Sequence, residues 1–400
     1  MQLPEEFINN TRQIMGDELF GRYQKSFEEK PPVSIRLNPM KTADLTVMAG
    51  SEAVPWCRGA FYLPCRPNFT MDPLLHAGCY YVQEAASMFL DEVLRQHLPD
   101  GPLMALDLCA APGGKSTLMR AVLPENSMLY SNEPIRQRAN ILAENMTKWG
   151  HCCTIVTNNY PENYSESNLR FDVVLCDVPC SGEGMFRKDE ATIHEWSPQN
   201  VERCWRLQRD IVSNAWACLN DGGLFIYSTC TFNTTENEEN VRWMLSEFDA
   251  NMLPVAIDPE WNITGSLLDG FNEPVFRFIP GVTRSEGLFM AVLRKGNKRK
   301  TVGGKCKVKT DKLRVISGDR MMEEAYAVDL SYTQAICFLR GEALTLPPDT
   351  PLGIVNVGFR GHLLGKVKNI GTRANNLYPK EWRIKTTHIS SDYEAILRHT

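Results

Sequence analysis

The sequence predicts an α/β protein: a doubly wound, largely parallel sheet domain, with a small α+β cap before it and a β-rich domain after it. Three observations lead to this prediction. Between about residues 100 and 250, short apolar runs alternate with amphipathic helical stretches, which is typical of a parallel sheet with helices on both faces. Residues 1–75 combine helical patterns with six prolines between positions 31 and 67. Residues 350–379 contain β-branched runs interrupted by Gly and Asn.

Length and composition exclude several classes of protein. At about 100–200 residues per domain, 400 residues suggest two or three domains, and 43% hydrophobic with 23% charged residues is an ordinary globular balance. No apolar run exceeds six residues, which is too short to span a membrane. The N-terminus, MQLPEEFINNTRQ, has neither the basic start nor the apolar core of a signal peptide. The 13 cysteines follow no repeating pattern, so we expect reduced thiols in a cytoplasmic protein, by default a monomer.

Charge is unevenly distributed along the chain. From Arg294 to the C-terminus there are 20 basic and 10 acidic residues, whereas the preceding residues hold 23 basic and 38 acidic ones. A basic region on an acidic body is expected for a protein with a polyanionic partner such as nucleic acid. A solvated basic surface without such a partner is the alternative.

Four segments are predicted in chain order. Residues 1–75 form the cap, with one or two short helices over 6–27, and residues 76–296 form the sheet domain. Residues 297–313 are basic and lack bulky apolar side chains, so they are expected to be a linker, and 314–400 form the β-rich domain.

The sheet domain has seven predicted strands. Five apolar runs alternate with helical stretches, at 104–110, 128–133, 153–158, 171–177 and 223–230. Two further runs, 274–280 and 287–296, have no helix between them, so an antiparallel pair is expected at one edge of the sheet.

A glycine-rich turn follows the first predicted strand, from Asp107 to Lys115, and leads into a helix. It is neither a Walker loop, because position 109 is Cys, nor a GxGxxG turn. Glu133 ends the second strand, where an acid can accept hydrogen bonds from ribose hydroxyls. Together these features favour an adenosine-containing ligand. The alternatives are a purely structural turn and an acid that only stabilises the start of the next helix.

An aspartate and two cysteines follow the fourth and fifth predicted strands. Asp177 begins DVPCSGEG, which contains Cys180, and Cys230 lies in YSTCTFNTTENE. Because ligands of open α/β sheets bind at the carboxyl ends of the strands, these three side chains are expected to meet in one pocket. A single cysteine at a strand end is usually a small buried apolar residue, but two beside polar residues indicate chemistry.

No metal site is predicted. Cysteine pairs occur at 176 and 180 and at 152 and 153. Neither pair is accompanied by a second pair or by histidines at zinc spacing, so zinc is not expected.

Several motifs resemble those of a known family. LDLCAAPGGKST, DVPCSGEG and YSTCTFNTTENE resemble the three signature motifs of the Sun-family RNA cytosine-5 methyltransferases. GCYYVQEAASM (78–88) and PVSIRLNPMK (32–41) resemble the segment before the cofactor domain and the N-terminal R-x-N segment of these enzymes. This resemblance covers about residues 1–296. The tail, with GFRGHLLG and NNLYPKEWRI, resembles the C-terminal RNA-binding part of the RsmF-type small-subunit ribosomal RNA methyltransferases.

The resemblance implies a Rossmann-like, S-adenosylmethionine-dependent methyltransferase domain between an RNA-binding cap and a PUA-like RNA-binding domain. The implied activity is methyl transfer to C5 of a cytosine in RNA, most simply 16S ribosomal RNA or the assembled small subunit. The same chemistry on transfer RNA is one alternative. A ribosome assembly factor that keeps the fold without catalysis is another, although such a scaffold would not need both cysteines.

The residues permit this chemistry. C5 of cytosine is a poor nucleophile until a thiolate adds to C6, and a cysteine is both a good nucleophile and a good leaving group. In the family the Thr-Cys residue, here Cys230, is the nucleophile, and the Pro-Cys residue, here Cys180, assists product release. DNA cytosine-5 enzymes use the Pro-Cys residue instead. The assignment to Cys230 therefore comes from the resemblance and not from the pattern.

Other site residues are carried over in the same way. Asp177 is expected to bond the cytosine edge or the amino acid end of the cofactor, and Lys115 to orient Asp177 and the base. Lys115 could otherwise be a surface lysine. After the third strand the family often has an acid, and Asn159 is our choice for its place. The resemblance assigns the cofactor to Cys109, Ala110, Ala111, Pro112, Gly113, Gly114, Lys115, Glu133, Asn159 and Asp177.

Two basic sets are expected to contact RNA. The first interleaves basic and aromatic residues, which suits a flipped base and its phosphates: Arg187, Lys188, Trp196, Arg203, Trp205, Arg206 and Arg209. An amphipathic helix that uses Trp205 as core is the alternative. The second set lies in the tail and would add phosphate affinity: Arg360, Lys366, Lys368, Arg373, Lys380 and Arg383.

Overall fold

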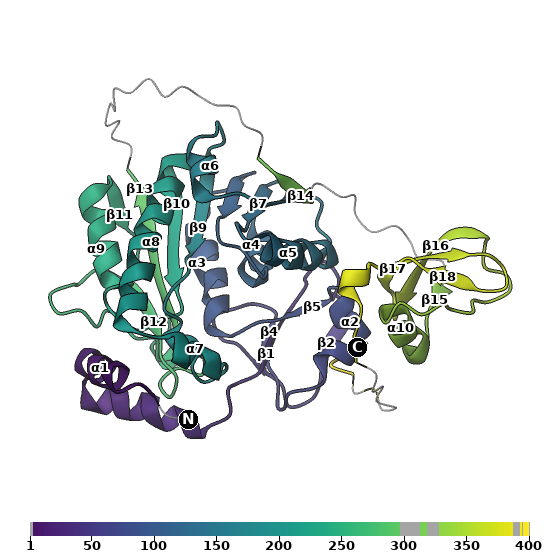
Figure 1. Ribbon diagram of the computed structural model, residues 1–400, viewed down its shortest axis with the longest axis horizontal. Helices are drawn as coiled ribbons and strands as arrows, with labels where there is room; N and C mark the ends of the chain where they lie inside the picture. Colours follow the sequence, from purple (N-terminus) through teal and green to yellow (C-terminus); the bar gives the residue numbers. More distant parts are fainter. Residues whose placement is uncertain (1–2, 297–312, 318–327, 387–392, 394, 400) are drawn as a thin grey trace.

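A nine-stranded sheet forms the centre of the computed structural model, which describes residues 3–296, 313–317, 328–386, 393 and 395–399 (Figure 1). Five of its strands run parallel in the spatial order β10-β9-β6-β7-β8. These strands are β6 (Met104–Asp107), β7 (Met128–Asn132), β8 (Thr154–Thr157), β9 (Phe171–Asp177) and β10 (Leu219–Thr229). The chain winds outward from β6 in both directions, which confirms the doubly wound sheet and places the switch point between β6 and β9.

Both edges of the sheet are antiparallel. β13 (Leu288–Lys295) pairs with β10, and β12 (Val275–Phe278) pairs with β13, which confirms the predicted strand pair. β11 (Ala250–Met252) pairs with the far end of β13. At the opposite edge β14 (Val315–Ser317) pairs with β8, so a strand from the segment predicted to be the C-terminal domain joins the central sheet.

Helices cover both faces of this sheet. One face carries α3 (Leu90–His97), α4 (Gly114–Val122) and α5 (Arg136–Trp149). The other carries α6 (Pro161–Ser165), α8 (Pro198–Cys218) and α9 (Glu238–Glu247). Side chains alternate along a strand, so in β9 Val173 and Leu175 enter the first core and Val174 and Cys176 the second.

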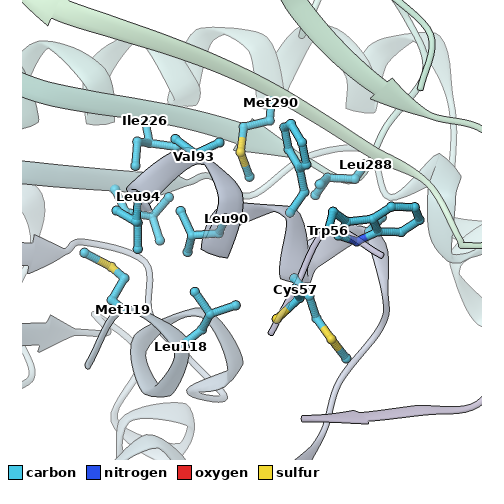
Figure 2. Packing of buried hydrophobic residues seen from close by; sticks show 14 of the residues in the cluster. Trp56, Cys57, Leu90, Val93, Leu94, Leu118, Met119, Ile226, Leu288 and Met290 are labelled. Carbon is cyan, nitrogen blue, oxygen red and sulfur yellow. The ribbon is translucent and has the colours of Figure 1, made fainter. Parts of the chain in front are cut away.

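The first core joins the sheet to the cap. Figure 2 shows its side chains from α3 and α4 close to those of β10 and β13 and of the cap. The labelled residues are Trp56, Cys57, Leu90, Val93, Leu94, Leu118, Met119, Ile226, Leu288 and Met290. Because Trp56 and Cys57 belong to this core, the cap is packed against the sheet domain and not merely tethered to it.

The N-terminal region is α+β, as predicted. α1 (Glu5–Lys25) is interrupted at Gly16, which has φ 74°, so it is two short helices in succession. A small sheet has the order β3-β4-β1-β5, from β1 (Ser34–Leu37), β3 (Glu52–Ala53), β4 (Ala60–Tyr62) and β5 (Tyr80–Val82). The region also contains four short helices: η1 (Ser26–Glu28), η2 (Phe69–Met71), α2 (Pro73–His76) and η3 (Ala86–Phe89). β5 lies beyond the predicted boundary at residue 75, and the boundary itself stays a prediction.

The C-terminal region is β-rich. Its sheet has the order β15-β16-β17-β18, with β15 (Val328–Asp329), β16 (Gly353–Phe359), β17 (His362–Asn369) and β18 (Ala374–Asn376). It also contains α10 (Tyr332–Leu339) and η6 (Lys380–Trp382). β19 (Leu397–His399) returns to pair with β2 (Leu45–Val47) of the N-terminal region, and the two regions share one hydrophobic core.

The predicted linker over 297–313 lies outside the described residues, except for Leu313. Within the described chain, no helix is both long enough and apolar enough to cross a membrane.

Candidate active site

The glycine-rich turn between β6 and α4 is fixed by its neighbours. The backbone N–H of Ala110 donates to the carbonyl of Asn132 (2.8 Å), and the Asn132 side chain donates back to Leu108 O (3.1 Å). From α5, Arg138 donates to Ala111 O and Asn145 to Pro112 O (2.9 and 2.8 Å). The predicted cofactor turn is thus hydrogen-bonded to the next strand, β7, and to α5, the helix that follows that strand.

Gly113 shows why this turn needs glycine. Its φ is 120°, a conformation that side chains disfavour. A Cβ there would lie 3.3 Å from Leu142 Cδ1 and 3.4 Å from Asn145 Cβ, so the α5 side chains would also have to move by a few tenths of an ångström.

Asp107 ends β6 and is fully buried. Its Oδ2 accepts a hydrogen bond from Ser116 Oγ (2.6 Å), while Oδ1 has no partner among the described residues. Burial raises the pKa of this carboxyl to about 7. We did not single out Asp107 from the sequence as a site residue, although a carboxylate at a strand end is the signal that would have identified it.

Glu133 follows β7 directly. Its Oε1 accepts a hydrogen bond from the backbone N–H of Ile135 (3.0 Å), and its Oε2 lies 3.4 Å from Arg138 Nη1. Its side chain is only 2% exposed. The structure therefore shows that Glu133 bonds to the backbone at the start of α5. The contact between Glu133 and a ribose stays a prediction, and it would involve Oε2.

Asn159 follows β8, as expected, but its side chain already has partners. Its Oδ1 accepts from the backbone N–H of Arg314 (3.0 Å), and its Nδ2 donates to Arg314 O (3.3 Å). This exchange attaches the strand β14 to the end of β8. A contact from Asn159 to adenosine would have to compete with it.

Asp177 and Lys115 meet across the switch point. Lys115 Nζ donates to Asp177 Oδ2 (2.8 Å), and Ser228 Oγ donates to Asp177 Oδ1 (2.6 Å). The Lys115 side chain is 14% exposed, so it is not a surface lysine. Burial alone would lower its pKa, but the Asp177 carboxylate outweighs burial and raises it, so the lysine stays charged. Ser228 was not predicted as a site residue.

The two predicted cysteines are in contact. The Sγ atoms of Cys180 and Cys230 lie 3.2 Å apart, and the backbone N–H of Cys230 points at Cys180 Sγ (3.4 Å). The hydrogen bond to Cys230, together with burial, raises the pKa of the Cys180 thiol well above its ordinary value. Cys180 is therefore held as a neutral thiol beside Cys230.

A cavity of about 270 Å³ opens beside Cys180, between the loop after β9 and the helices α7 (Glu190–Glu195) and α8. Its lining includes Ser181, Gly182, Arg203 and Leu207. Arg203 is exposed and brings positive charge to the rim of this cavity.

Two glycines bring the backbone close to Cys230. The N–H of Gly184, in η4 (Glu183–Met185), donates to Cys230 O (2.8 Å). A Cβ on Gly184 would lie 2.8 Å from both Cys230 O and Gly287 Cα. Gly287, just before β13, was not predicted; only close packing, invisible in the sequence, identifies it.

The expected RNA contacts after β9 divide into two groups. Arg187 forms a buried ion pair with Glu286 (2.9 Å), and Trp196 is buried, with its Nε1 donating to Glu183 (2.9 Å). These two residues have packing roles, contrary to the RNA contact that we expected. Arg209 lies over the Trp205 ring (4.3 Å), which fits the alternative of a packed helix. The exposed members are Lys188, Arg203 and Arg206.

The tail set divides similarly. Arg360 packs over the Tyr393 ring (5.0 Å), and Arg383 is half-buried. The other four are exposed: Lys366, Lys368, Arg373 and Lys380.

The R-x-N segment supports the cofactor turn from the cap. Arg36 is buried and donates to Gln83 Oε1 (2.9 Å) and to Thr117 Oγ1 in α4 (2.6 Å). Asn38 donates to the carbonyls of Gly78 and Trp149 (both 2.9 Å). This segment therefore ties the cap to both α4 and α5.

One group of three side chains in the described residues could hold a metal ion: His151, Cys152 and Cys153, whose ligand atoms lie within 4.8 Å of one another. His151 Nδ1 already accepts from the backbone N–H of Cys153 (3.1 Å). Three donors fall short of the four of a structural zinc site. The expectation of no metal stays a prediction.

The doubly wound sheet is the fold of Rossmann-like methyltransferases, and comparison with known proteins identifies the family. Residues 98–294 match the family model of the 16S rRNA methyltransferase RsmB/F. Residues 3–85 match the N-terminal domain of the 16S rRNA methyltransferase RsmF, and 325–384 match the RsmF PUA domain. The chain belongs to the RsmB/F methyltransferase family, with the N-terminal and PUA domains of the RsmF type.

Curated relatives agree. The chain is 32% identical over 308 residues to the ribosomal RNA small subunit methyltransferase F of Pectobacterium atrosepticum, covering 73% of this chain and 63% of the relative. It is 31% identical over 313 residues to the protein of the same name from Escherichia coli O81, with the same two coverages. The chain thus spans less than two thirds of the length of these relatives.

Solved structures share the fold. A methyltransferase homolog protein from Pyrococcus horikoshii is 26% identical, with a TM-score of 0.62 over 73% of this chain and 95% of that one. NSun6 from Pyrococcus horikoshii, solved with SFG, is 19% identical, with a TM-score of 0.61 over 74% of this chain and 99% of that one.

Proposed function

We propose that the protein transfers a methyl group from S-adenosylmethionine to C5 of a cytosine in small-subunit ribosomal RNA, through a covalent bond between Cys230 and C6 of the base. The observation that carries the proposal is the contact between Cys180 and Cys230, whose Sγ atoms lie 3.2 Å apart beside the Lys115–Asp177 pair. A thiol nucleophile with a second thiol in contact, at the ends of adjacent strands and beside a carboxylate paired with lysine, can carry out this reaction.

The thiols have separate tasks. The Cys230 thiolate adds to C6, and the resulting enamine makes C5 nucleophilic toward the methyl group. A base then accepts the C5 proton, the C5–H electron pair re-forms the double bond to C6, and the C6–S bond breaks to release the Cys230 thiolate. Cys180, kept neutral by its surroundings, can donate an S–H hydrogen bond that stabilises the departing Cys230 thiolate, since their separation is a hydrogen-bond distance.

Asp177 and Lys115 would orient the base. Lys115 donates to Oδ2 of Asp177 and Ser228 donates to Oδ1, and these two hydrogen bonds fix the plane of the carboxylate. The Asp177 side chain is still 32% exposed, so it can accept a further hydrogen bond from the amino group of cytosine.

The cofactor supplies the electrophilic methyl group. The residues around the turn after β6 fit its charged and hydroxyl groups. Asp107 Oδ1 is buried without a partner among the described residues, and Glu133 follows the next strand. We assign the cofactor to the predicted turn residues 109–115 with Glu133 and Asp177, and we keep Asn159 as the outermost contact.

The RNA target rests on the relatives. Their shared name is ribosomal RNA small subunit methyltransferase F, and the RsmF PUA match adds a domain that suits RNA. Transfer RNA as the target, and a non-catalytic assembly factor, remain the competing proposals. A cytoplasmic monomer remains the expected form.

Methyl transfer from labelled S-adenosylmethionine to unmodified RNA tests the proposal. We expect label at one cytosine of small-subunit RNA, located by bisulfite sequencing, and loss of label with Cys230→Ala. Cys65→Ala is the matched control, because Cys65 is exposed and lies in the cap. Label in transfer RNA would change the target, and full activity of Cys230→Ala would exclude Cys230 as the nucleophile.

A further inference from the structure

Two buried carboxylates connect the loops that carry Cys180 and Cys230. Glu183 belongs to the loop after β9, and Glu236 belongs to the loop after β10. Their exposed fractions are 2% and 0%. Each carboxylate accepts hydrogen bonds from the backbone of the other loop, so the connection is reciprocal.

Glu183 fixes the Cys230 loop. Its Oε2 accepts hydrogen bonds from the backbone N–H groups of Phe232 (2.7 Å) and Asn233 (3.0 Å). Its Oε1 accepts from Trp196 Nε1 (2.9 Å) and Asn233 Nδ2 (3.0 Å). The first of these donors lies two residues after Cys230, so Glu183 sets the path of the chain as it leaves the thiol.

Glu236 fixes the Cys180 loop. Its Oε2 accepts hydrogen bonds from the backbone N–H of Ser181 (3.0 Å) and from Gln208 Nε2 (2.7 Å). The same Gln208 nitrogen donates to Pro179 O (2.9 Å). Ser181, after Cys180, is therefore bonded to Glu236, and Pro179, before Cys180, is bonded to Gln208, which itself bonds to Glu236.

Asn233 connects the two acids. Its Nδ2 donates to Glu183 Oε1 (3.0 Å) and to Glu236 Oε1 (2.8 Å), and its Oδ1 accepts from the backbone N–H of Glu236 (2.8 Å). All four carboxylate oxygens thus face N–H donors. An amide in place of either acid would turn an NH₂ group toward a donor and leave buried polar groups unpaired.

We propose that Glu183, Glu236 and Asn233 form a carboxylate clamp that positions the two thiols against each other before RNA or cofactor binds. They are positioning residues, since they bond to the cysteine loops and not to the reacting atoms. Their importance for catalysis rests on the proposed function, because the hydrogen bond between the two sulfurs depends on the distance that the clamp sets.

The rate of disulfide formation between Cys180 and Cys230 measures this distance without RNA or cofactor. Diamide takes up the two thiol hydrogens and is reduced to its hydrazine, while the two sulfurs join. Mass spectrometry of the linked peptides gives the rate, at a temperature where every variant is folded. We expect Glu236→Gln and Glu183→Gln to form the disulfide at least about tenfold more slowly than the wild type.

Glu239→Gln is the matched control. Glu239 makes an exposed ion pair with Arg242 (2.9 Å) on α9, so its disulfide rate should equal that of the wild type. If the glutamine variants do not fold, Asn233→Ala removes one hydrogen bond to each carboxylate and the one from the Glu236 backbone N–H, without changing charge, and should also slow the reaction. Unchanged rates in the clamp variants, or no linkage of Cys180 to Cys230 in the wild type, would overturn the proposal.

Steady-state kinetics separate positioning from general damage. We expect Glu236→Gln to lower kcat for methyl transfer by about 10- to 100-fold, with KM for S-adenosylmethionine within about twofold, because the cofactor turn is untouched. Slow disulfide formation with unchanged kcat would overturn the catalytic role of the clamp. If the wild type transfers no methyl group, the proposed function fails, yet the disulfide rates still decide whether the clamp exists.

Discussion

Lys115 Nζ lies 2.8 Å from Asp177 Oδ2, so the helix after the first parallel strand is bonded to the end of the fourth. This ion pair spans the switch point of the sheet, and Ser228 from the next strand completes it. The ends of β9 and β10 and the start of α4 are thereby connected at the place where the reacting base is proposed to bind. Arrangement of the site and stability of the sheet depend on the same contacts.

Breaking this pair should reduce activity strongly. Lys115→Met leaves the Asp177 carboxylate without its counter-charge, and we expect kcat to fall by about 100-fold or more. A double-mutant cycle with Asp177→Asn should give a coupling of about 1–3 kcal/mol in transition-state energy. Lys25→Met, at an exposed lysine of α1, is the control. Additive losses from the two single variants would contradict the cooperation of this pair.

Gly184→Ala should disrupt the active site through the backbone. The added Cβ would meet Cys230 O and Gly287 Cα at 2.8 Å, and neither backbone can yield without moving the Cys230 loop. We expect a loss of about 1–3 kcal/mol in stability and at least about a tenfold drop in methyl transfer. Gly265→Ala is the control, since no atom lies within 4 Å of its added Cβ. Wild-type activity in Gly184→Ala would show that this close approach is not required.

Removing one partner of the buried pair of Arg277 and Glu238 should be strongly destabilising. Both side chains are at most 1% exposed, and Arg277 Nη1 also donates to Phe232 O (2.8 Å) near the Cys230 loop. Arg277→Met leaves a buried carboxylate unpaired, so urea denaturation should show a loss of about 3–5 kcal/mol. Arg242→Met removes an exposed pair and should cost less than about 1 kcal/mol. Similar losses in the two variants would refute this ranking.

Stability should depend on pH through Asp107. Burial raises its pKa from 3.8 to about 7, so between these values the folded protein binds a proton that the unfolded chain has released. The contribution of Asp107 to stability is therefore greatest at low pH and is lost as pH rises toward 7, at about 1.4 kcal/mol per pH unit. Asp107→Asn can still accept the hydrogen bond from Ser116 but does not titrate.

Urea denaturation at pH 5, 6 and 7 measures this effect. The difference in unfolding free energy, wild type minus Asp107→Asn, should fall steadily over that range. Parallel curves for the two proteins would mean that Asp107 titrates at its ordinary pKa in the folded state.

Much of the fold could be predicted from local pattern. The five parallel strands and the antiparallel pair at 274–296 are continuous apolar runs, and their periodicity is visible without tertiary information. β14 could not be predicted in this way. Its three residues become a strand only because β8 offers an unpaired edge and Asn159 bonds to the preceding residue, Arg314.

The site residues likewise include some that the sequence could predict and some that it could not. Cys180, Cys230 and Asp177 were expected to meet because strand ends converge at one edge of a parallel sheet, whereas Lys115 was assigned by the family resemblance. Trp196 and Arg187 were expected to contact RNA, but a basic and aromatic composition does not reveal that Glu183 and Glu286 are their buried partners. These interactions join residues that are not neighbours in the sequence, so no local pattern predicts them.

The proposed covalent bond between Cys230 and the RNA can be trapped. Cys180→Ala is incubated with S-adenosylmethionine and labelled small-subunit RNA, then run on a denaturing gel. We expect a slow-migrating protein–RNA band, because Cys230 can attack while release is impaired, and no band when Cys230→Ala is added to the same protein. A band that persists without Cys230, or no band with Cys180→Ala alone, would contradict it.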